Sequence, residues 1–215
     1  AIPYIHGFSW YEALAHHQLP VHLENDANCV GLSELLAHPE TENAACVVIG
    51  TGIGGAMIIN GKLHRGRHGL GGEFGYMTTL APTEKLNNWS QLASTGSMVR
   101  YVNEKSGQSD WDGRKIYQEA AAGNVLCQEA IERMNRNLAQ GLLNIQYLID
   151  PDVISLGGSI SQNPDFIKGV QKAVDAFVER YEEYTIAPVI QACTYRADAN
   201  LYGALVNWLQ EENQW

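Results

Sequence analysis

The stretch VVIGTGIGGAMIING, residues 47–61, contains the pattern that decides how this part of the chain folds. Gly50, Gly52 and Gly55 stand in the spacing G-x-G-x-x-G, after an apolar run that is typical of a buried strand. The same spacing marks dinucleotide-binding turns, in which a strand leads through the glycines into a helix whose N-terminus holds a pyrophosphate. The stretch is therefore either a strand–turn–helix unit or a hairpin.

The residues after the glycines favour the hairpin. The short apolar run AMII, residues 56–59, is closed by Asn60-Gly61, a pair typical of two-residue hairpin turns. A hairpin offers no helix N-terminus to a pyrophosphate, so we expect no dinucleotide site. Two explanations of the glycines remain: close packing in a plain hairpin, or a tight turn that presents Thr51 and backbone N–H groups to a phosphate.

Outside this stretch, strand and helix patterns alternate, which predicts an α/β fold. A strand is expected within 20–26, leading into a helix over 27–38. Helices are also expected over 90–104 and 112–122, from 164 to about 183, and over 198–210. The longest predicted helix, 125–149, carries apolar residues at i, i+3 and i+4 spacing, so one of its faces belongs to the core.

Composition limits the class of protein. The 215 residues are 45% hydrophobic and carry a formal net charge of -10, which argues against binding to nucleic acid or to an anionic membrane surface. No apolar run approaches the roughly 20 residues of a membrane span. The four cysteines lie scattered in apolar contexts without a C-x-x-C pair, which predicts buried free thiols and a cytoplasmic location.

Four segments in order carry a family resemblance: LENDAN (23–28), GTGIGGAMIING (50–61), GRHGLGGEFGYM (66–77) and ISLGGSIS (154–161). Together they resemble the ROK family of sugar kinases and sugar-responsive repressors, which have the two-lobed actin/hexokinase-like (ribonuclease H-like) α/β fold. The stretches AIPYIHGFSWYEAL and KLNNWSQLASTGSMVRY are most similar to bacterial β-glucoside kinases. Those enzymes phosphorylate the 6-hydroxyl of a glucosyl unit in disaccharides such as cellobiose.

The resemblance implies an ATP- and Mg²⁺-dependent sugar kinase. It also implies that residues 1–43 are the remainder of a small N-terminal lobe, that 44–197 form the large lobe, and that a C-terminal helix within 198–215 packs back on the small lobe. Members of the family often form homodimers through the larger lobe. The family's first phosphate loop, Asp-x-Gly-Gly-Thr, does not occur in these residues, so the fold is expected to be N-terminally incomplete and this chain could be inactive alone.

Asp26 is the candidate catalytic residue. Its position alone, where a strand meets a helix, is equally typical of an N-cap aspartate. In the family the matching carboxylate is the general base that accepts the proton of the attacking sugar hydroxyl. The resemblance also matches Asn25 to a ligand of a sugar hydroxyl.

The resemblance matches two glycine-rich turns to the nucleotide site. Thr51, Gly52 and Gly54 correspond to the second phosphate loop. The segment LGGS corresponds to the loop that packs against adenosine, with Gly157, Gly158 and Ser159 as its candidate residues, although it is also typical of a plain strand-to-helix turn.

Four further residues are candidates for the sugar site. Glu73, flanked by glycines, matches a carboxylate that binds two sugar hydroxyls. His68 is either a residue of the ligand loop or a surface histidine. Tyr76 stands where many relatives have the His of an E-x-G-H motif, and Gln91 stands where many have a Glu.

The Cys-rich zinc motif of many family members has no counterpart here, because no Cys occurs between Leu80 and Leu92. A structural zinc needs about four Cys or His ligands, so no zinc is expected. A sugar-sensing domain of a ROK repressor is the alternative function, but a basic helix-turn-helix, the mark of that class, is not found in these residues.

Overall fold

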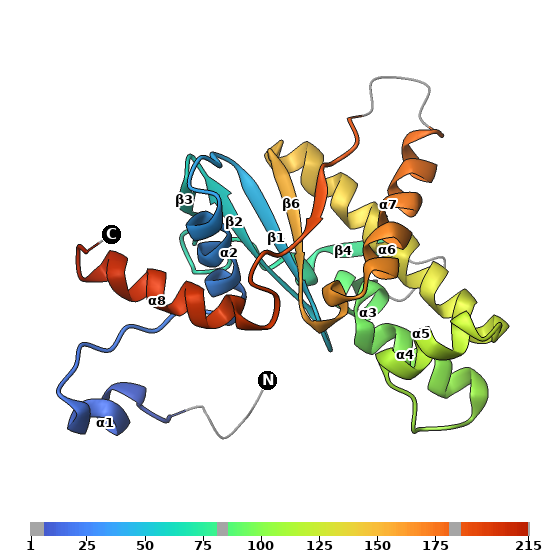
Figure 1. The fold of residues 1–215 in the computed structure, drawn as a ribbon, viewed down its shortest axis with the longest axis horizontal. Helices are drawn as coiled ribbons and strands as arrows, with labels where there is room; N and C mark the ends of the chain where they lie inside the picture. Colours follow the sequence, from blue (N-terminus) through green and yellow to red (C-terminus); the bar gives the residue numbers. More distant parts are fainter. Residues whose placement is uncertain (1–6, 81–85, 181–185, 215) are drawn as a thin grey trace.

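The computed structural model describes residues 7–80, 86–180 and 186–214, which form a mixed α/β fold (Figure 1). Its α-helices and strands are, in chain order, α1 (Trp10–Leu14), α2 (Asp26–Ala37), β1 (Ala44–Ile49), β2 (Ile53–Ile59), β3 (Lys62–Leu63), β4 (Thr78–Leu80), β5 (Leu86–Asn88), α3 (Trp89–Ala93), α4 (Thr95–Ser106), α5 (Gly113–Ala121), α6 (Val125–Ile149), β6 (Val153–Gly157), α7 (Pro164–Val178), β7 (Ile190–Ala192) and α8 (Ala199–Glu211).

Within the described residues, the main sheet has five strands in the order β3-β2-β1-β6-β7. β1 pairs antiparallel with β2, whereas β1, β6 and β7 run parallel to one another. The opening stretch is therefore a hairpin, as predicted, and not a strand–turn–helix unit. Its second turn is the predicted one: Asn60 and Gly61 both have positive φ, 52° and 68°, which is the conformation of a type I′ turn.

Helices cover both faces of this sheet (Figure 1). Val47 and Ile49 of β1 point into the larger core cluster, to which α6 contributes most. Cys46, on the opposite face of the same strand, packs with Val30 of α2. The strand is thus buried on both faces, as its nearly continuous apolar sequence indicates.

The long helix α6 has the predicted bounds, and its predicted core face is confirmed, since Met134, Leu138, Leu142 and Ile145 are at most 1% exposed. The four cysteines are free and buried, also as predicted. No helix among the described residues combines the length and the apolarity needed to cross a bilayer.

The C-terminal helix α8 packs along α2 (Figure 1). Gly203 is the point of closest approach, because a Cβ atom there would collide with the carbonyl of Cys29. The division into lobes at residue 43 stays a prediction.

Three expected elements differ. The helix expected over 90–104 breaks at Ser94, which has extended backbone (φ -81°, ψ 161°) and separates α3 from α4. Its side chain explains the break: Oγ accepts from the N–H of Ser97 and donates to the carbonyl of Thr51. The strand expected within 20–26 does not form: the residues before Asp26 make no ladder with any described strand. An apolar pattern alone therefore did not predict strand pairing here. The helix expected to reach about 183 ends at Val178.

Candidate functional site

The glycine-rich segments converge at the carboxyl ends of β1 and β6. A Cβ atom on Gly54 would lie 3.2 Å from that of Ala27, which places the start of α2 beside the hairpin. A Cβ atom on Gly158 would collide with the carbonyl of Ile49, so the loop after β6 lies against the end of β1. The carboxyl ends of parallel strands are where α/β sheets bind ligands.

Asp26 is the first residue of α2 and not its cap. The cap is Asn25, whose Oδ1 accepts from the N–H groups of Ala27 (2.9 Å) and Asn28 (3.1 Å). The interpretation of Asp26 as an N-cap is therefore wrong. Its own Oδ1 accepts from the N–H of Ala27 (2.9 Å), and Oδ2 has no partner among the described residues. The exposed carboxylate lies at the N-terminus of α2.

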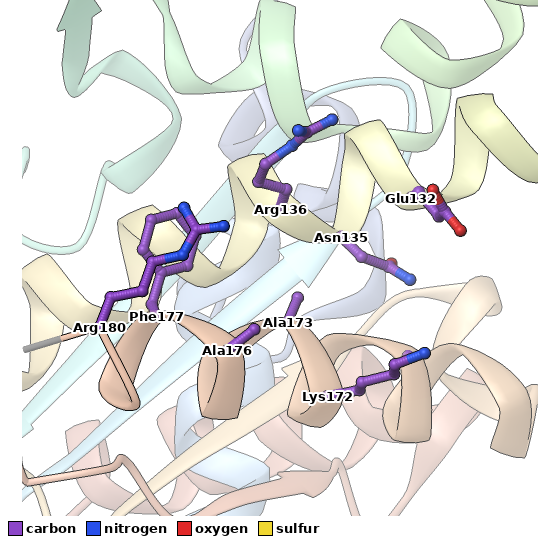
Figure 2. A pocket seen from close by; sticks show the side chains of 9 residues that line it. Glu132, Asn135, Arg136, Lys172, Ala173, Ala176, Phe177 and Arg180 are labelled. Atoms are coloured by element: carbon purple, nitrogen blue, oxygen red, sulfur yellow. The ribbon is translucent and has the colours of Figure 1, made fainter.

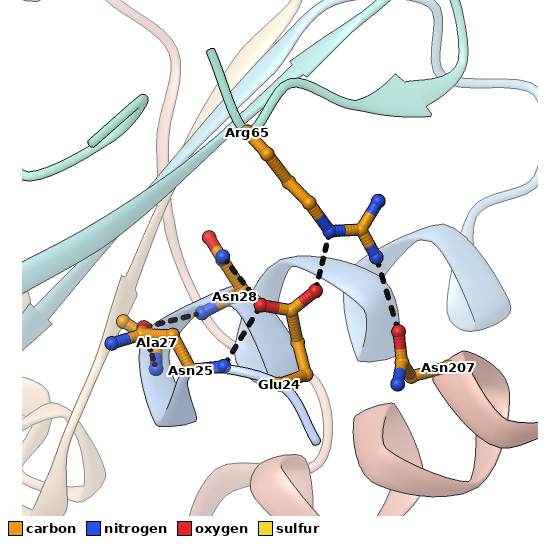
Figure 3. A network of polar contacts seen from close by, with 6 residues as sticks. All are labelled: Glu24, Asn25, Ala27, Asn28, Arg65 and Asn207. Atoms are coloured by element: carbon orange, nitrogen blue, oxygen red, sulfur yellow. Dashed lines mark hydrogen bonds and ion pairs between the residues drawn. The ribbon is translucent and has the colours of Figure 1, made fainter. Parts of the chain in front are cut away.

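A partly buried carboxylate that the sequence did not single out holds this helix start in place (Figure 3). The side chain of Glu24 is 10% exposed and accepts three hydrogen bonds, from the N–H of Asn25 (2.8 Å), Nδ2 of Asn28 (2.8 Å) and Nε of Arg65 (2.6 Å). Arg65 in turn donates to Oδ1 of Asn207 on α8 (3.0 Å). A direct bond joins α8 to α2, since Nδ2 of Asn200 donates to the carbonyl of Asp26 (3.1 Å).

This network makes a prediction about pH. Burial alone would raise the pKa of Glu24, but the hydrogen bonds from Asn28, Asn25 and Arg65, with the charge of Arg65, bring that pKa below its ordinary value. A depressed folded-state pKa stabilises the fold above the unfolded pKa of about 4.3, and this contribution disappears as pH falls through the folded pKa. We expect the free-energy difference of unfolding between wild type and Glu24→Gln to be largest at neutral pH and to shrink below about pH 4.

Urea titrations of both proteins from pH 7 to pH 3 measure this difference. Glu12→Gln, a change at an exposed position on α1, is the matched control and is expected to follow wild type at every pH. A difference between wild type and Glu24→Gln that grows on acidification would contradict the assignment.

The turn between β1 and β2 is fixed through its carbonyl groups, whereas N–H groups of its exposed residues remain available. The N–H of Gly96 donates to the carbonyl of Gly50 (3.2 Å), and Oγ of Ser94 donates to that of Thr51 (3.0 Å). Thr51 and Gly52 are exposed, and their N–H groups have no acceptor within the described part of the chain. Free N–H groups on a fixed turn are suited to bind an anion.

Glu73 lies between glycines that pack on β2. A Cβ atom on Gly75 would collide with the carbonyl of Ile53, and Gly72 has a left-handed φ of 88° against the backbone of Ala56. The loop therefore cannot shift away from the hairpin without losing these contacts. The half-buried Glu73 side chain has no hydrogen-bond partner in the ranges that the structure describes.

The other candidates for the sugar site differ in how they are engaged. His68 and Tyr76 are exposed, and Tyr76 is 72% exposed. Gln91 takes part in a capping box, in which its Oε1 accepts from the N–H of Asn88 (3.0 Å) and its own N–H donates to Asn88 Oδ1 (3.0 Å). The structure thus gives Gln91 a structural task, and the sugar-binding roles of all three stay predictions.

A cavity of about 710 Å³ opens beside Ser159. It is lined by the start of α4, by α5 and by the short 3-10 helix Ser159–Gln162. Two of its lining residues, Thr95 and Tyr117, have buried hydroxyl oxygens with no hydrogen-bond partner among the described residues. Burial, together with the charge of Asp165, raises the pKa of Tyr117, so its hydroxyl stays protonated. Unpaired buried hydroxyls in a cavity next to a glycine loop fit a polar ligand.

Sequence reasoning missed this cavity wall and the Glu24 network. The position of Glu24 beside Asn25 within LENDAN was the available signal for the network. The pattern of α5 showed only an amphipathic helix. No group of three or more His, Cys, Asp or Glu side chains within residues 7–80, 86–180 and 186–214 could hold a metal ion.

Comparison with known proteins identifies the family. The model of the ROK family matches residues 12–211. A β-glucoside kinase of Listeria monocytogenes is 34% identical over 212 residues, which are 95% of this chain and 69% of that protein. An uncharacterised protein of Clostridium perfringens is 41% identical over 146 residues, which are 66% of this chain but only 48% of that protein. This chain thus belongs to the ROK family, and it spans between about half and two thirds of these relatives.

Solved structures share the fold. The crystal structure of a ROK family protein from Streptococcus pneumoniae TIGR4, in complex with sucrose, superposes with a TM-score of 0.93 at 90% identity and covers all of this chain and 74% of that one. A ROK family glucokinase from Streptomyces griseus, in complex with glucose and AMPPNP, gives 0.76 at 26% identity over 90% of this chain and 69% of that one. The predicted fold class, α/β of the hexokinase-like type, is confirmed.

Proposed function

We propose that this ROK family chain is part of an ATP-dependent sugar kinase that transfers the γ-phosphoryl group to the 6-hydroxyl of a glucosyl unit, with a β-glucoside such as cellobiose as substrate. One observation carries the proposal: the start of α2 with Asp26, the open turn at Thr51 and the loop at Ser159 all lie at one edge of the sheet, beside a cavity with unpaired hydroxyls. Two relatives, named β-glucoside kinase and glucokinase, are sugar kinases by name, which supports the same type of reaction here.

In this proposal, Asp26 accepts the proton of the attacking sugar hydroxyl through its unpartnered Oδ2. The Glu24 network keeps the backbone of Asp26 at the edge of the hairpin. Glu73 and Asn25 bind sugar hydroxyls, and His68 and Tyr76 border the same site. Since phosphoryl transfer depends chiefly on positioning and charge neutralisation, the rigid attachment of these residues is the main contribution of the fold.

The N–H groups of Thr51 and Gly52 donate hydrogen bonds to the phosphates of ATP. Gly54, the next glycine along the chain, packs against the start of α2. The adenosine packs on Gly157, Gly158 and Ser159 and enters the cavity, where the hydroxyls of Thr95 and Tyr117 gain partners. Mg²⁺ is usually bound in proteins through one or two carboxylates and the substrate's phosphates, so the absence of a larger acidic cluster from the described residues is compatible with it. Mg²⁺ would neutralise charge that develops on the phosphoryl group.

The substrate is tested by a coupled ATPase assay on the intact natural protein with cellobiose, glucose, sucrose and N-acetylmannosamine. Sucrose is included because it is bound in the structure of the related Streptococcus pneumoniae protein and contains a glucosyl unit. We expect the highest kcat/KM with cellobiose. Tight sugar binding without turnover on any of the four would contradict the kinase proposal and favour the sugar-sensing alternative.

The cavity yields a second prediction. Thr95→Val with Tyr117→Phe removes two hydroxyls that ATP is proposed to satisfy, and each such hydrogen bond is worth about 0.5–1.5 kcal/mol. We expect the KM for ATP to rise roughly tenfold while the KM for the sugar stays unchanged. In the absence of ATP the variant is expected to be at least as stable as wild type, because two unpaired buried hydroxyls are gone.

Steady-state kinetics with each substrate varied in turn measure both constants. Tyr101→Phe is the matched control, since the Tyr101 hydroxyl donates to Glu129 on the surface and does not line the cavity. An unchanged KM for ATP would exclude this cavity as the nucleotide site. Assembly as a homodimer and a cytoplasmic location remain further parts of the proposal.

A further inference from the structure

The groove between α6 and α7 is a second hollow, separate from the residues of the proposed kinase site. Its volume is about 400 Å³, within the usual range for small-molecule sites. In Figure 2, α6 and α7 form its two walls, and Asn135 points from α6 toward α7. Its floor is apolar, with Ala173 and Phe177 of α7 packed against the core.

Asn135 is a buried polar group that lacks a partner. The residue is 5% exposed, and its Oδ1 has no hydrogen bond within the described part of the chain. Leaving such an acceptor unpaired carries the full cost of removing it from water. A Cβ atom on Gly169 would lie 2.5 Å from Asn135 Nδ2, so α7 carries no side chain at the position that the amide occupies. The amide therefore packs against the backbone of α7 at Gly169, and its buried Oδ1 is left without a donor among the described residues.

The rim of the groove is cationic. Arg136, Lys172 and Arg180 line it, and none of the three forms an ion pair with another described residue. Of the described lining residues, Glu132 alone is acidic. Arg180 lies beside Phe177 at one end of the groove, and Lys172 lies toward the other end (Figure 2). A local excess of positive charge in a chain of net charge -10 favours an anionic ligand.

We propose that this groove binds a phosphorylated sugar. Arg180 holds the phosphate beside Phe177, whose ring packs on the C–H face of the sugar. Toward the other end of the groove, Asn135 Oδ1 and Glu132 each accept from a sugar hydroxyl, and Lys172 donates to one. The choice of a sugar phosphate rests on the proposed kinase function, whose product has this chemistry.

Isothermal titration calorimetry with glucose 6-phosphate tests the site in the intact protein. We expect Lys172→Ala/Arg180→Ala to lose at least tenfold in affinity at one binding event. Lys168→Ala, which removes one positive charge at an exposed position of α7 outside the groove, is expected to bind as wild type does. Glu73→Ala, which alters only the proposed sugar site, is expected to retain the event that the double variant loses.

Titration with inorganic phosphate distinguishes the contribution of the phosphate group from that of the sugar. Wild type is expected to bind glucose 6-phosphate about tenfold more tightly than phosphate, and Asn135→Leu is expected to bring the two affinities within about twofold, because the hydroxyl acceptor is gone. Equal binding of glucose 6-phosphate by wild type and Lys172→Ala/Arg180→Ala would overturn the proposal. That result would leave the kinase proposal unaffected, since turnover with sugars tests it separately.

Discussion

Asp26→Asn in the intact protein is expected to lower kcat for sugar phosphorylation by about three orders of magnitude while the sugar dissociation constant stays within about twofold. General-base catalysis contributes roughly 10²–10⁴-fold, and the amide of Asn cannot accept the proton. The change keeps the shape of the side chain, and Asn25 remains the cap of α2, so the helix start is preserved. The small loss of a favourable charge at the helix N-terminus, about 0.3–1 kcal/mol, is too little to unfold the protein.

The measurement combines steady-state kinetics with calorimetric titration of the sugar. Asp175→Asn, at an exposed position on α7, is the control and is expected to keep wild-type kcat. If Asp26→Asn retains most of its turnover, Asp26 is not the general base. If sugar affinity falls together with kcat, the carboxylate binds the substrate and its role in proton transfer is unsupported.

The hairpin shows what sequence patterns can decide. The G-x-G-x-x-G spacing alone was ambiguous, and Asn60-Gly61 resolved it because that pair tolerates the positive φ of a type I′ turn. The apolar face of α6 followed equally directly from helical periodicity. In contrast, the break at Ser94 depends on a bond to the carbonyl of Thr51, 43 residues away, and no local pattern carries that information.

In the candidate site too, local motifs could be predicted from the sequence and contacts between distant segments could not. The resemblance pointed to Asp26 because that residue belongs to a short, ordered motif. It did not reveal that Glu24 and Arg65 fix the motif, since their pairing joins segments 41 residues apart. Nor could the resemblance distinguish a sugar-binding role for Gln91 from its role as partner of the cap residue Asn88, because both roles suit an amide in the first turn of a helix.

Gly203→Val is expected to destabilise the fold by about 3 kcal/mol or more, a large share of the roughly 5–15 kcal/mol that stabilises a typical domain. At Gly203 even a Cβ atom collides with the carbonyl of Cys29, so α8 must move away from α2. This movement exposes Val206 and Asn207, which are 1% and 4% exposed in the structure. It also breaks the bonds from Asn200 to Asp26 and from Arg65 to Asn207.

Urea unfolding measures the loss, and Ala204→Val provides the control, because residue 204 is exposed on the same helix and the same β-branched side chain costs only about 0.5 kcal/mol there. Kinetics at a temperature where Gly203→Val remains folded should show a lower kcat, since Asp26 loses its support from α8. Equal unfolding free energies for the two variants would mean that α8 does not pack this closely on α2. A destabilised Gly203→Val with wild-type kcat would mean that α8 stabilises the fold without positioning Asp26.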